Sequence, residues 1–209
     1  MGHPLETNHP FVSIYQNPKL ATTSHKLAGG QDITFLPMQA ADSALFGQFL
    51  AKLSEETRSK WRPHDFTLEV ARQVCSNLVT DGSLRLMAIT AQHSTPELIA
   101  YFILDSKISA GDRERFMAFN RSISETTTCR FAPAVADAYQ NAGIGSLLMP
   151  TCLDIARRVG YQQMILMGGV LISNHQAVRF YEKSGFEIVG TFSPGPNKED
   201  SYDMILRLT

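Results

Sequence analysis

A predicted strand and a predicted helix are joined at residues 135–146, which read Val135-Ala136-Asp137-Ala138-Tyr139-Gln140-Asn141-Ala142-Gly143-Ile144-Gly145-Ser146. Glycine lets a backbone adopt positive φ and approach a ligand closely. The first turn of a helix leaves about four N–H groups unpaired and carries roughly half a positive charge. Such an anion site is suited to bind a diphosphate group. The same pattern also fits a tight turn that only seats the helix against a sheet.

Two familiar nucleotide-binding motifs do not fit this loop. The dinucleotide fingerprint GxGxxG requires a third glycine where Leu148 stands. The phosphate-binding loop GxxxxGK[ST] requires a lysine that the chain does not place there. By itself the loop therefore predicts an anion site and does not identify the ligand.

The chain on either side of the loop alternates between strand and helix patterns. Cys129–Val135 predicts a strand, and apolar residues at helical spacing from Ile144 to Val159 predict a helix that Gly160 ends. Pro133 removes one ladder donor, so we expect a bulge or a sheet edge at that point. Pro150 lies inside the helix and predicts a kink after the first turn and a half.

The last part of the chain reads as strand, helix and two strands. Met164–Met167 is continuously apolar and predicts a central strand that is covered on both faces. Asn174 is suited to cap a helix that ends at Gly185. Phe186–Phe192 and Tyr202–Leu208 predict the last two strands.

The N-terminal half predicts elements of both kinds. They are a strand at Ile33–Leu36, a helix at Leu45–Leu53, a short helix capped by Ser54, a helix at Thr67–Leu78, and a hairpin of Leu84–Thr90 and Leu98–Leu104 linked around Ser94. Residues 1–30 predict an irregular arm or a short added element, and residues 106–127 a long polar loop that could serve as a lid. The order predicts a mixed α/β sheet with helices on both faces, in one domain over residues 31–209.

Composition excludes several classes of protein. The 209 residues are 44% apolar with a net charge of −1, which gives no electrostatic case for nucleic acid or an anionic membrane. The N-terminus lacks a secretory signal, and no apolar run approaches the roughly 18 residues of a membrane span. The three separated cysteines have no metal-ligand spacing and predict buried thiols in a reducing compartment. We expect a soluble, cytoplasmic protein without a metal.

Two motifs in the C-terminal half resemble those of the GNAT superfamily of N-acetyltransferases. The motif Q/R-x-x-G-x-G/A is matched by Gln140, Gly143 and Gly145. The motif N-x-x-A-x-x-x-Y-x-x-x-G-F is matched by Asn174, Ala177, Tyr181, Gly185 and Phe186. The resemblance implies a mixed, mostly antiparallel sheet of six to seven strands, in which one central strand splays from its neighbour at a bulge. It also implies acetyl-CoA as the co-substrate.

The resemblance assigns roles to individual residues. Backbone amides of Gln140–Ser146 would hold the coenzyme A pyrophosphate, and the strand ending at Val135 would hydrogen-bond the pantetheine arm. Asn174 would meet the pantetheine or cap the next helix. Tyr181 would protonate the departing thiolate, with a core aromatic as the alternative. The implied coenzyme-binding residues are Pro133, Ala134, Val135, Gln140, Asn141, Ala142, Gly143, Ile144, Gly145, Ser146 and Asn174.

No residue stands out as the general base. Asp137 reads as a turn residue, and residues 111–115 and Glu125 as a solvated loop that could reach the site. His64 and His175 are candidates because histidine is a common general base, but they stand beside a proline and at a helix start, where histidine is usually structural.

The sequence therefore predicts an acetyltransferase that moves an acetyl group from acetyl-CoA to a primary amine by direct transfer. A catalytically silent acyl-CoA-binding sensor and acyl transfer to a hydroxyl remain as alternatives. The expected partners are a small-molecule amine or a peptide acceptor, and a homodimer stays open.

Overall fold

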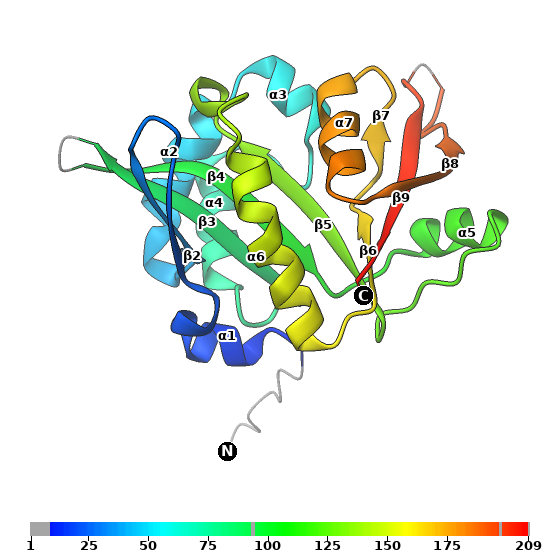
Figure 1. Ribbon diagram of the computed structural model, residues 1–209, viewed down its shortest axis with the longest axis horizontal. Helices are drawn as coiled ribbons and strands as arrows, with labels where there is room; N and C mark the ends of the chain where they lie inside the picture. Colours follow the sequence, from blue (N-terminus) through cyan, green and yellow to red (C-terminus); the bar gives the residue numbers. More distant parts are fainter. Residues whose placement is uncertain (1–8, 93–94, 197, 209) are drawn as a thin grey trace.

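The computed structural model describes residues 9–92, 95–196 and 198–208, and within them nine strands form one mixed sheet (Figure 1). Their order is β1-β2-β3-β4-β5-β6-β9-β7, and β8 pairs with β9 on its opposite side. Neighbouring strands are antiparallel except for the parallel pair β5–β6. The strands are β1 (Thr23–Lys26), β2 (Asp32–Pro37), β3 (Ser83–Gln92), β4 (Thr95–Asp105), β5 (Thr128–Val135), β6 (Gln163–Leu166), β7 (Val170–Leu171), β8 (Glu187–Phe192) and β9 (Ser201–Arg207).

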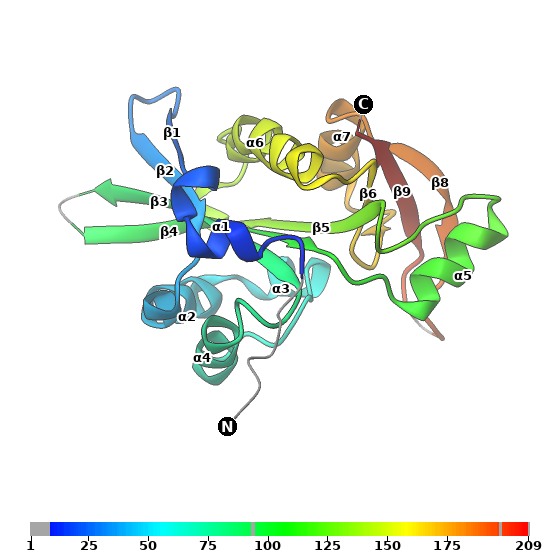
Figure 2. The same cartoon turned by 90° about the horizontal axis from the view of Figure 1, so that it is seen from below.

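Helices cover both faces of this sheet. Figure 2 shows α6 and α7 on one face and α2, α3 and α4 on the other. The helices are α1 (Val12–Gln16), α2 (Ser43–Lys52), α3 (Glu55–Lys60), α4 (Leu68–Ser76), α5 (Ala110–Ala118), α6 (Ile144–Val159) and α7 (His175–Lys183). The predicted architecture is confirmed, but the expected six to seven strands were too few. The additions are short: β1 has four residues and β7 two, so neither gives a clear periodic pattern.

The core lies between the sheet and its two helical layers. An aromatic row crosses the sheet, with ring centroids 5.5 Å apart for Phe35 and Phe102 and 5.7 Å apart for Phe102 and Phe131. Every residue of β4 from Leu98 to Asp105 is buried, as expected for a central strand covered on both faces. This rigid centre fixes the end of β5, where the candidate site begins.

Residues 9–31, before β2, contain short added elements, the second of the two sequence-based alternatives. It contains α1, a 3-10 turn at Pro18–Ala21 and β1, which pairs with β2. Phe11 and Ile14 are fully or almost fully buried in the core. For residues 12–26 the description as an irregular arm is therefore wrong, because these residues pack and pair with the sheet.

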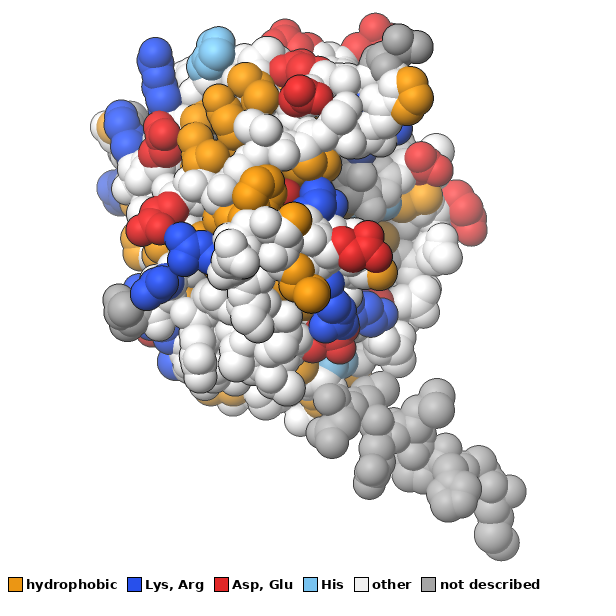
Figure 3. All heavy atoms as spheres, turned by 90° about the vertical axis from the view of Figure 1, so that its right-hand side faces the viewer, with side chains coloured by type: hydrophobic (Ala, Val, Ile, Leu, Met, Phe, Trp, Pro, Cys, Tyr) orange, Lys and Arg blue, Asp and Glu red, His pale blue; other side chains and the backbone are white. Residues whose placement is uncertain are grey.

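Residues 106–127 hold a helix that the sequence did not predict. Ser109 and Asp112 form a reciprocal capping box at the start of α5. Only Asp112 and Phe116 of this helix are buried, so it lacks the apolar stripe by which helices are recognised. Figure 3 looks onto this end of the molecule, where hydrophobic side chains lie among charges of both signs.

Pro133 lies at an open sheet edge, one of the two alternatives predicted for it, and Pro150 does not end its helix. The β4–β5 register runs unbroken past Pro133, so β5 has an open edge there and no bulge. Register shifts lie instead in the β3–β4 pair, between Ala88 and Ile89, and in the β8–β9 pair, between Ile188 and Gly190. Helix α6 continues through Pro150 as one element. The hairpin link predicted around Ser94 lies outside the described residues.

Candidate active site

The central strands β5 and β6 separate halfway along β5. Their parallel pairing ends at Phe131 and Leu166, followed by one last bond from the Met167 N–H to the Phe131 carbonyl at 2.9 Å. Gly168 and Gly169 then adopt φ values of 74° and 71°, which turn the chain away from β5. Residues 132–135 keep β4 on one side only. The splayed central pair implied by the sequence resemblance is thus present, and it leaves one edge of β5 open.

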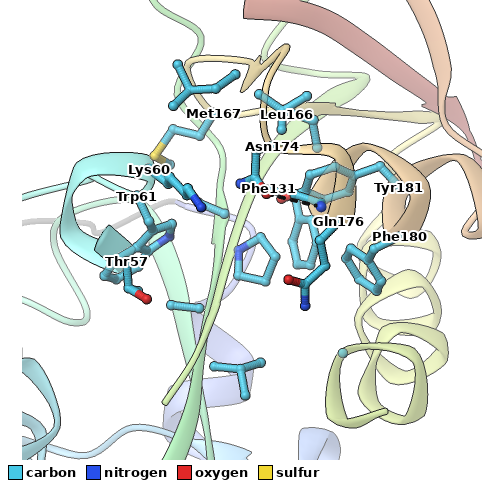
Figure 4. Close-up of a pocket in the computed structure, with 18 of the residues that line it drawn as sticks. Thr57, Lys60, Trp61, Phe131, Leu166, Met167, Asn174, Gln176, Phe180 and Tyr181 are labelled. Carbon is cyan, nitrogen blue, oxygen red and sulfur yellow. Dashed lines mark hydrogen bonds between the residues drawn. The ribbon is translucent and has the colours of Figure 1, made fainter. Parts of the chain in front are cut away.

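A cleft of about 1300 Å³ occupies this separation. Figure 4 shows its two walls: Thr57, Lys60 and Trp61 from the α3 segment face Gln176, Phe180 and Tyr181 from α7, with β5 between them. Strand alternation sends successive side chains of β5 to opposite faces of the sheet. Cys129 and Phe131 therefore face the α6 side, and Arg130 faces α5, to which it is ion-paired through Asp112.

On the α6 side, the loop 140–146 presents bare backbone amides to the cleft. Asn141 and Gly143 have φ values of 63° and 77°, which shape the tight turn before the helix. Gly143 is the N-cap of α6, and no described side chain hydrogen-bonds to this helix end. Space at Gly145 is tight: a Cβ there would lie 3.1 Å from the Phe180 ring. Uncapped amides at this helix end are the feature on which the sequence-based prediction of an anion site depends.

The cleft brings together almost all the sequence-predicted site residues. Of these residues, Ala142 is exposed and does not line the cleft. The others do line it: Pro133, Ala134, Val135, Gln140, Asn141, Gly143, Ile144, Gly145, Ser146, Asn174 and Tyr181. The Gln140 side chain folds back, and its Nε2 donates to the Val135 carbonyl at 3.2 Å and the Thr57 hydroxyl at 3.1 Å. Asn174 Oδ1 accepts from the Ala177 N–H at 3.3 Å, so this residue caps α7.

Tyr181 reaches the cleft from α7 (Figure 4). The side chain is buried, and burial raises its pKa above the ordinary tyrosine value. Its ring contacts Phe180 and Phe186, with centroids 5.1 and 5.5 Å away. Within the described residues its hydroxyl has no hydrogen-bond partner. Tyr181 is thus both a core aromatic and a neutral phenol beside the cleft.

The candidate bases hold structural positions. Asp137 accepts hydrogen bonds from Ser54 and Thr57 at the start of α3. Burial lowers the pKa of His64, whose ring packs on Trp61 and Tyr101. His175 is the exposed first residue of α7. Among residues 111–115, Asp112 and Arg115 do reach the cleft, in helix α5 rather than a loop.

The sequence did not reveal an ion-pair network that closes the α5 end of the cleft. Arg130 pairs with Asp105 and, at 3.2 Å, with Asp112. Arg115 pairs with Asp112 and with Asp203, both at 2.8 Å. The three aspartates are buried, and burial raises the pKa of Asp203 although the ion pair with Arg115 opposes this. Five residues from β4, α5, β5 and β9 thereby fix α5 against the sheet.

Comparison with known proteins gives a consistent result. Residues 123–186 match the model of the Acetyltransferase (GNAT) family. Over 138 residues, the chain is 28% identical to an acetyltransferase of Pseudomonas aeruginosa, covering 66% of this chain and 67% of that protein.

Solved structures share the fold. The GNAT domain of S. lividans PAT has a TM-score of 0.67 at 18% identity, covering 91% of this chain and 98% of that one. An aminoglycoside acetyltransferase, solved with coenzyme A and kanamycin, has a TM-score of 0.61 at 20% identity, covering 84% and 94%. Among the described residues, none of the helices has both the length and the apolar character that a membrane crossing requires.

Proposed function

The chain belongs to the GNAT family of acetyltransferases, and from this we propose that it transfers an acetyl group from acetyl-CoA directly to a primary amine. The observation that carries the proposal is the splay of β5 from β6 beside the uncapped start of α6. A strand-like ligand arm and a diphosphate would be bound side by side there. A solved structure of similar fold, an aminoglycoside acetyltransferase, was obtained with coenzyme A, which agrees with this assignment.

The residues that would hold the coenzyme fall into two groups. The N–H groups at Gly143–Ser146 would bind the pyrophosphate, because nothing in the described chain caps them. The open edge of residues 133–135 would pair with the pantetheine arm, as an added strand does. Pro133 has no N–H, so it can offer only its carbonyl. Asn174 would contribute indirectly, by holding the start of α7 beside the cleft.

Bound acetyl-CoA supplies an already activated acyl group, so the chain needs few reacting side chains. Its main tasks are to bring an amine to the right position, to polarise a carbonyl through a backbone N–H, and to move two protons. We propose that the Tyr181 hydroxyl donates a proton to the leaving thiolate. Burial makes its hydroxyl a weaker acid, but the same apolar surroundings also disfavour a thiolate, which keeps the proton transfer feasible.

The acceptor amine would approach from the α5 and α3 side. The side chains of β5 on that face are Thr128, Arg130, Ala132 and Ala134, so β5 offers no carboxylate as a base. We infer that the amine binds in its neutral form or loses its proton to water. Known structures of similar fold include a spermidine and an aminoglycoside acetyltransferase, which makes polyamines and amino sugars the first acceptors to test.

A thiol-release screen with acetyl-CoA tests this function. The panel should contain polyamines, aminoglycosides, amino acids, and peptides with a free N-terminus or lysine. We expect release of coenzyme A with at least one acceptor. Calorimetry with acetyl-CoA alone runs in parallel, because binding without release across the panel would favour an acyl-CoA sensor. Absence of binding would contradict the assignment of the cleft.

A further inference from the structure

A cluster of hydrogen bonds connects the candidate coenzyme loop to helix α3, about 80 residues earlier in the chain. Asp137 is the first residue of a 3-10 turn, Asp137–Tyr139, that follows β5 directly. One carboxylate oxygen, Oδ2, accepts from the Ser54 N–H at 2.9 Å. The other, Oδ1, accepts from the Ser54 hydroxyl at 2.5 Å and the Thr57 hydroxyl at 2.7 Å. We call this group, with Gln140, the loop–α3 latch.

Gln140 extends the latch into the loop itself. Its Nε2 donates to the Thr57 hydroxyl at 3.1 Å, while the Thr57 hydroxyl donates to Asp137. The same Nε2 also donates to the Val135 carbonyl at 3.2 Å, at the open edge of β5. The loop that would bind pyrophosphate and the strand that would bind pantetheine are therefore joined through one side chain to α3.

Helix α3 depends on outside support because it is very short. Six residues are far fewer than an isolated helix needs for stability in water. Ser54 caps it, and the Asp137 carboxylate lies at its positive end. Slight burial would raise the pKa of Asp137, but hydrogen bonds from Ser54 and Thr57 outweigh it and lower the pKa. The carboxylate thus stays ionised and holds the start of the helix.

The other end of α3 forms a wall of the acceptor side. Lys60 and Trp61 line the cleft opposite α7 (Figure 4). The backbone N–H of Trp61 donates to the Thr57 carbonyl at 3.0 Å. Thr57 therefore belongs to the latch and is also hydrogen-bonded to the wall. The Trp61 indole packs edge-on against Tyr101 and His64, with ring centroids 5.7 and 5.6 Å away.

We propose that Asp137 is a positioning residue that couples coenzyme binding in the loop to the shape of the acceptor wall. This inference rests on the proposed function. The latch bonds to Asp137 are solvent-exposed and individually weak, so we expect α3 to open locally more often when the loop is empty. A coenzyme that orders residues 140–146 favours the closed latch, and thermodynamic linkage makes the effect reciprocal. The acceptor wall is then complete mainly in the coenzyme-bound protein.

Trp61 reports on this coupling without any acceptor, because it is the only tryptophan in the chain. Acetyl-CoA is titrated while Trp61 emission and hydrogen exchange at residues 56–61 are followed. In the wild type we expect a saturable emission change and slower exchange. Asp137→Ala should reduce both responses at least about threefold, while calorimetric acetyl-CoA affinity falls less than about fivefold, the lower range of coupling factors.

Three further variants distinguish loss of the latch from misfolding and from a general effect of removing an aspartate. Thr57→Val removes the shared hydroxyl and should reproduce the loss, even if Asp137→Ala folds poorly. Asp137→Asn keeps acceptor oxygen for Ser54 and should restore part of the response. Asp154→Ala, which removes an exposed aspartate paired with Arg158 in α6, should respond like the wild type.

The outcomes separate the two proposals. If wild-type protein binds acetyl-CoA but Trp61 and α3 do not respond, the coupling is wrong and the proposed function stands. An undiminished response in Asp137→Ala and Thr57→Val also overturns the coupling. If calorimetry detects no acetyl-CoA binding to the wild type, the proposed function fails and the coupling fails with it.

Discussion

The Phe180 ring of α7 lies against the backbone of Gly145, with its nearest carbon 3.1 Å from the position that a Cβ would occupy. This contact sets the distance between α7 and the start of α6. The two sequence motifs are therefore joined in space as well as along the chain, and residue 145 has little room for any side chain.

Two substitutions of Gly145 should separate the effect of side-chain size on acetyl-CoA affinity from the effect of negative charge. Gly145→Glu places a carboxylate among the uncapped amides and against Phe180, so we expect acetyl-CoA affinity to fall by more than about 100-fold. Gly145→Ala requires Phe180 to shift only slightly and should cost less than about tenfold. Calorimetry measures both. Gly29→Glu, where a Cβ meets nothing within 4 Å, is the control. Unchanged affinity in Gly145→Glu would refute the pyrophosphate site.

Tyr181→Phe tests the proton donor. We expect turnover to fall at least about tenfold with nearly unchanged acetyl-CoA affinity, since one general acid contributes about 100-fold or more. The buried hydroxyl has no partner among the described residues, so thermal stability should not drop. Because burial raises the Tyr181 pKa, the group stays protonated, and no alkaline decline in rate below about pH 10 should be traceable to it. Full turnover in Tyr181→Phe would exclude this role.

The ion-pair network should matter for stability. Arg115→Met leaves the buried carboxylates of Asp112 and Asp203 without this partner, and breaking such a pair costs about 3 kcal/mol. Arg113→Met on the same helix breaks an exposed pair with Glu125 and a long hydrogen bond to the Ile108 carbonyl (3.4 Å), and should cost about 1 kcal/mol or less. Urea unfolding compares the two. Equal effects would mean that the network does not anchor α5.

The pH dependence of the latch has a defined sign. The folded-state pKa of Asp137 is lowered, so its stabilising effect is present above the unfolded pKa of about 3.9 and is lost as pH falls through the folded value. Wild type should therefore be more stable than Asp137→Asn at neutral pH, and the difference should vanish below that window. A difference that persists at acid pH would mean that ionisation of Asp137 is unimportant.

The C-terminal half was predictable because its signals are local. The apolar stripe of α6, the Asn174 cap and the glycine loop each follow from a few neighbouring residues, and the structure has them where the pattern indicates. Helix α5 was missed because it is polar, although Ser109 and Asp112 carried a capping-box signal. Strand β1 was missed because Thr-Ser-His-Lys is a short edge segment without a hydrophobic face.

The remaining site residues could not have been found from spacing. Asp105, Asp112, Arg115, Arg130 and Asp203 meet only because four elements converge at one end of the sheet. Asp137 was read as a turn residue, which its position supports. Its contacts with Ser54 and Thr57 are set by tertiary structure, and no local sequence pattern predicts them.

The two consecutive glycines after β6 have a kinetic consequence. Since Gly168 and Gly169 bend the chain by their own backbone angles, the gap beside β5 exists before any ligand arrives. A ligand that enters this gap therefore finds the edge of β5 already open, and its binding does not require β5 and β6 to separate. Little of its association energy is then spent on rearranging the sheet. Capture should therefore be fast and limited by diffusion and orientation, leaving residence time as the quantity that distinguishes one ligand from another.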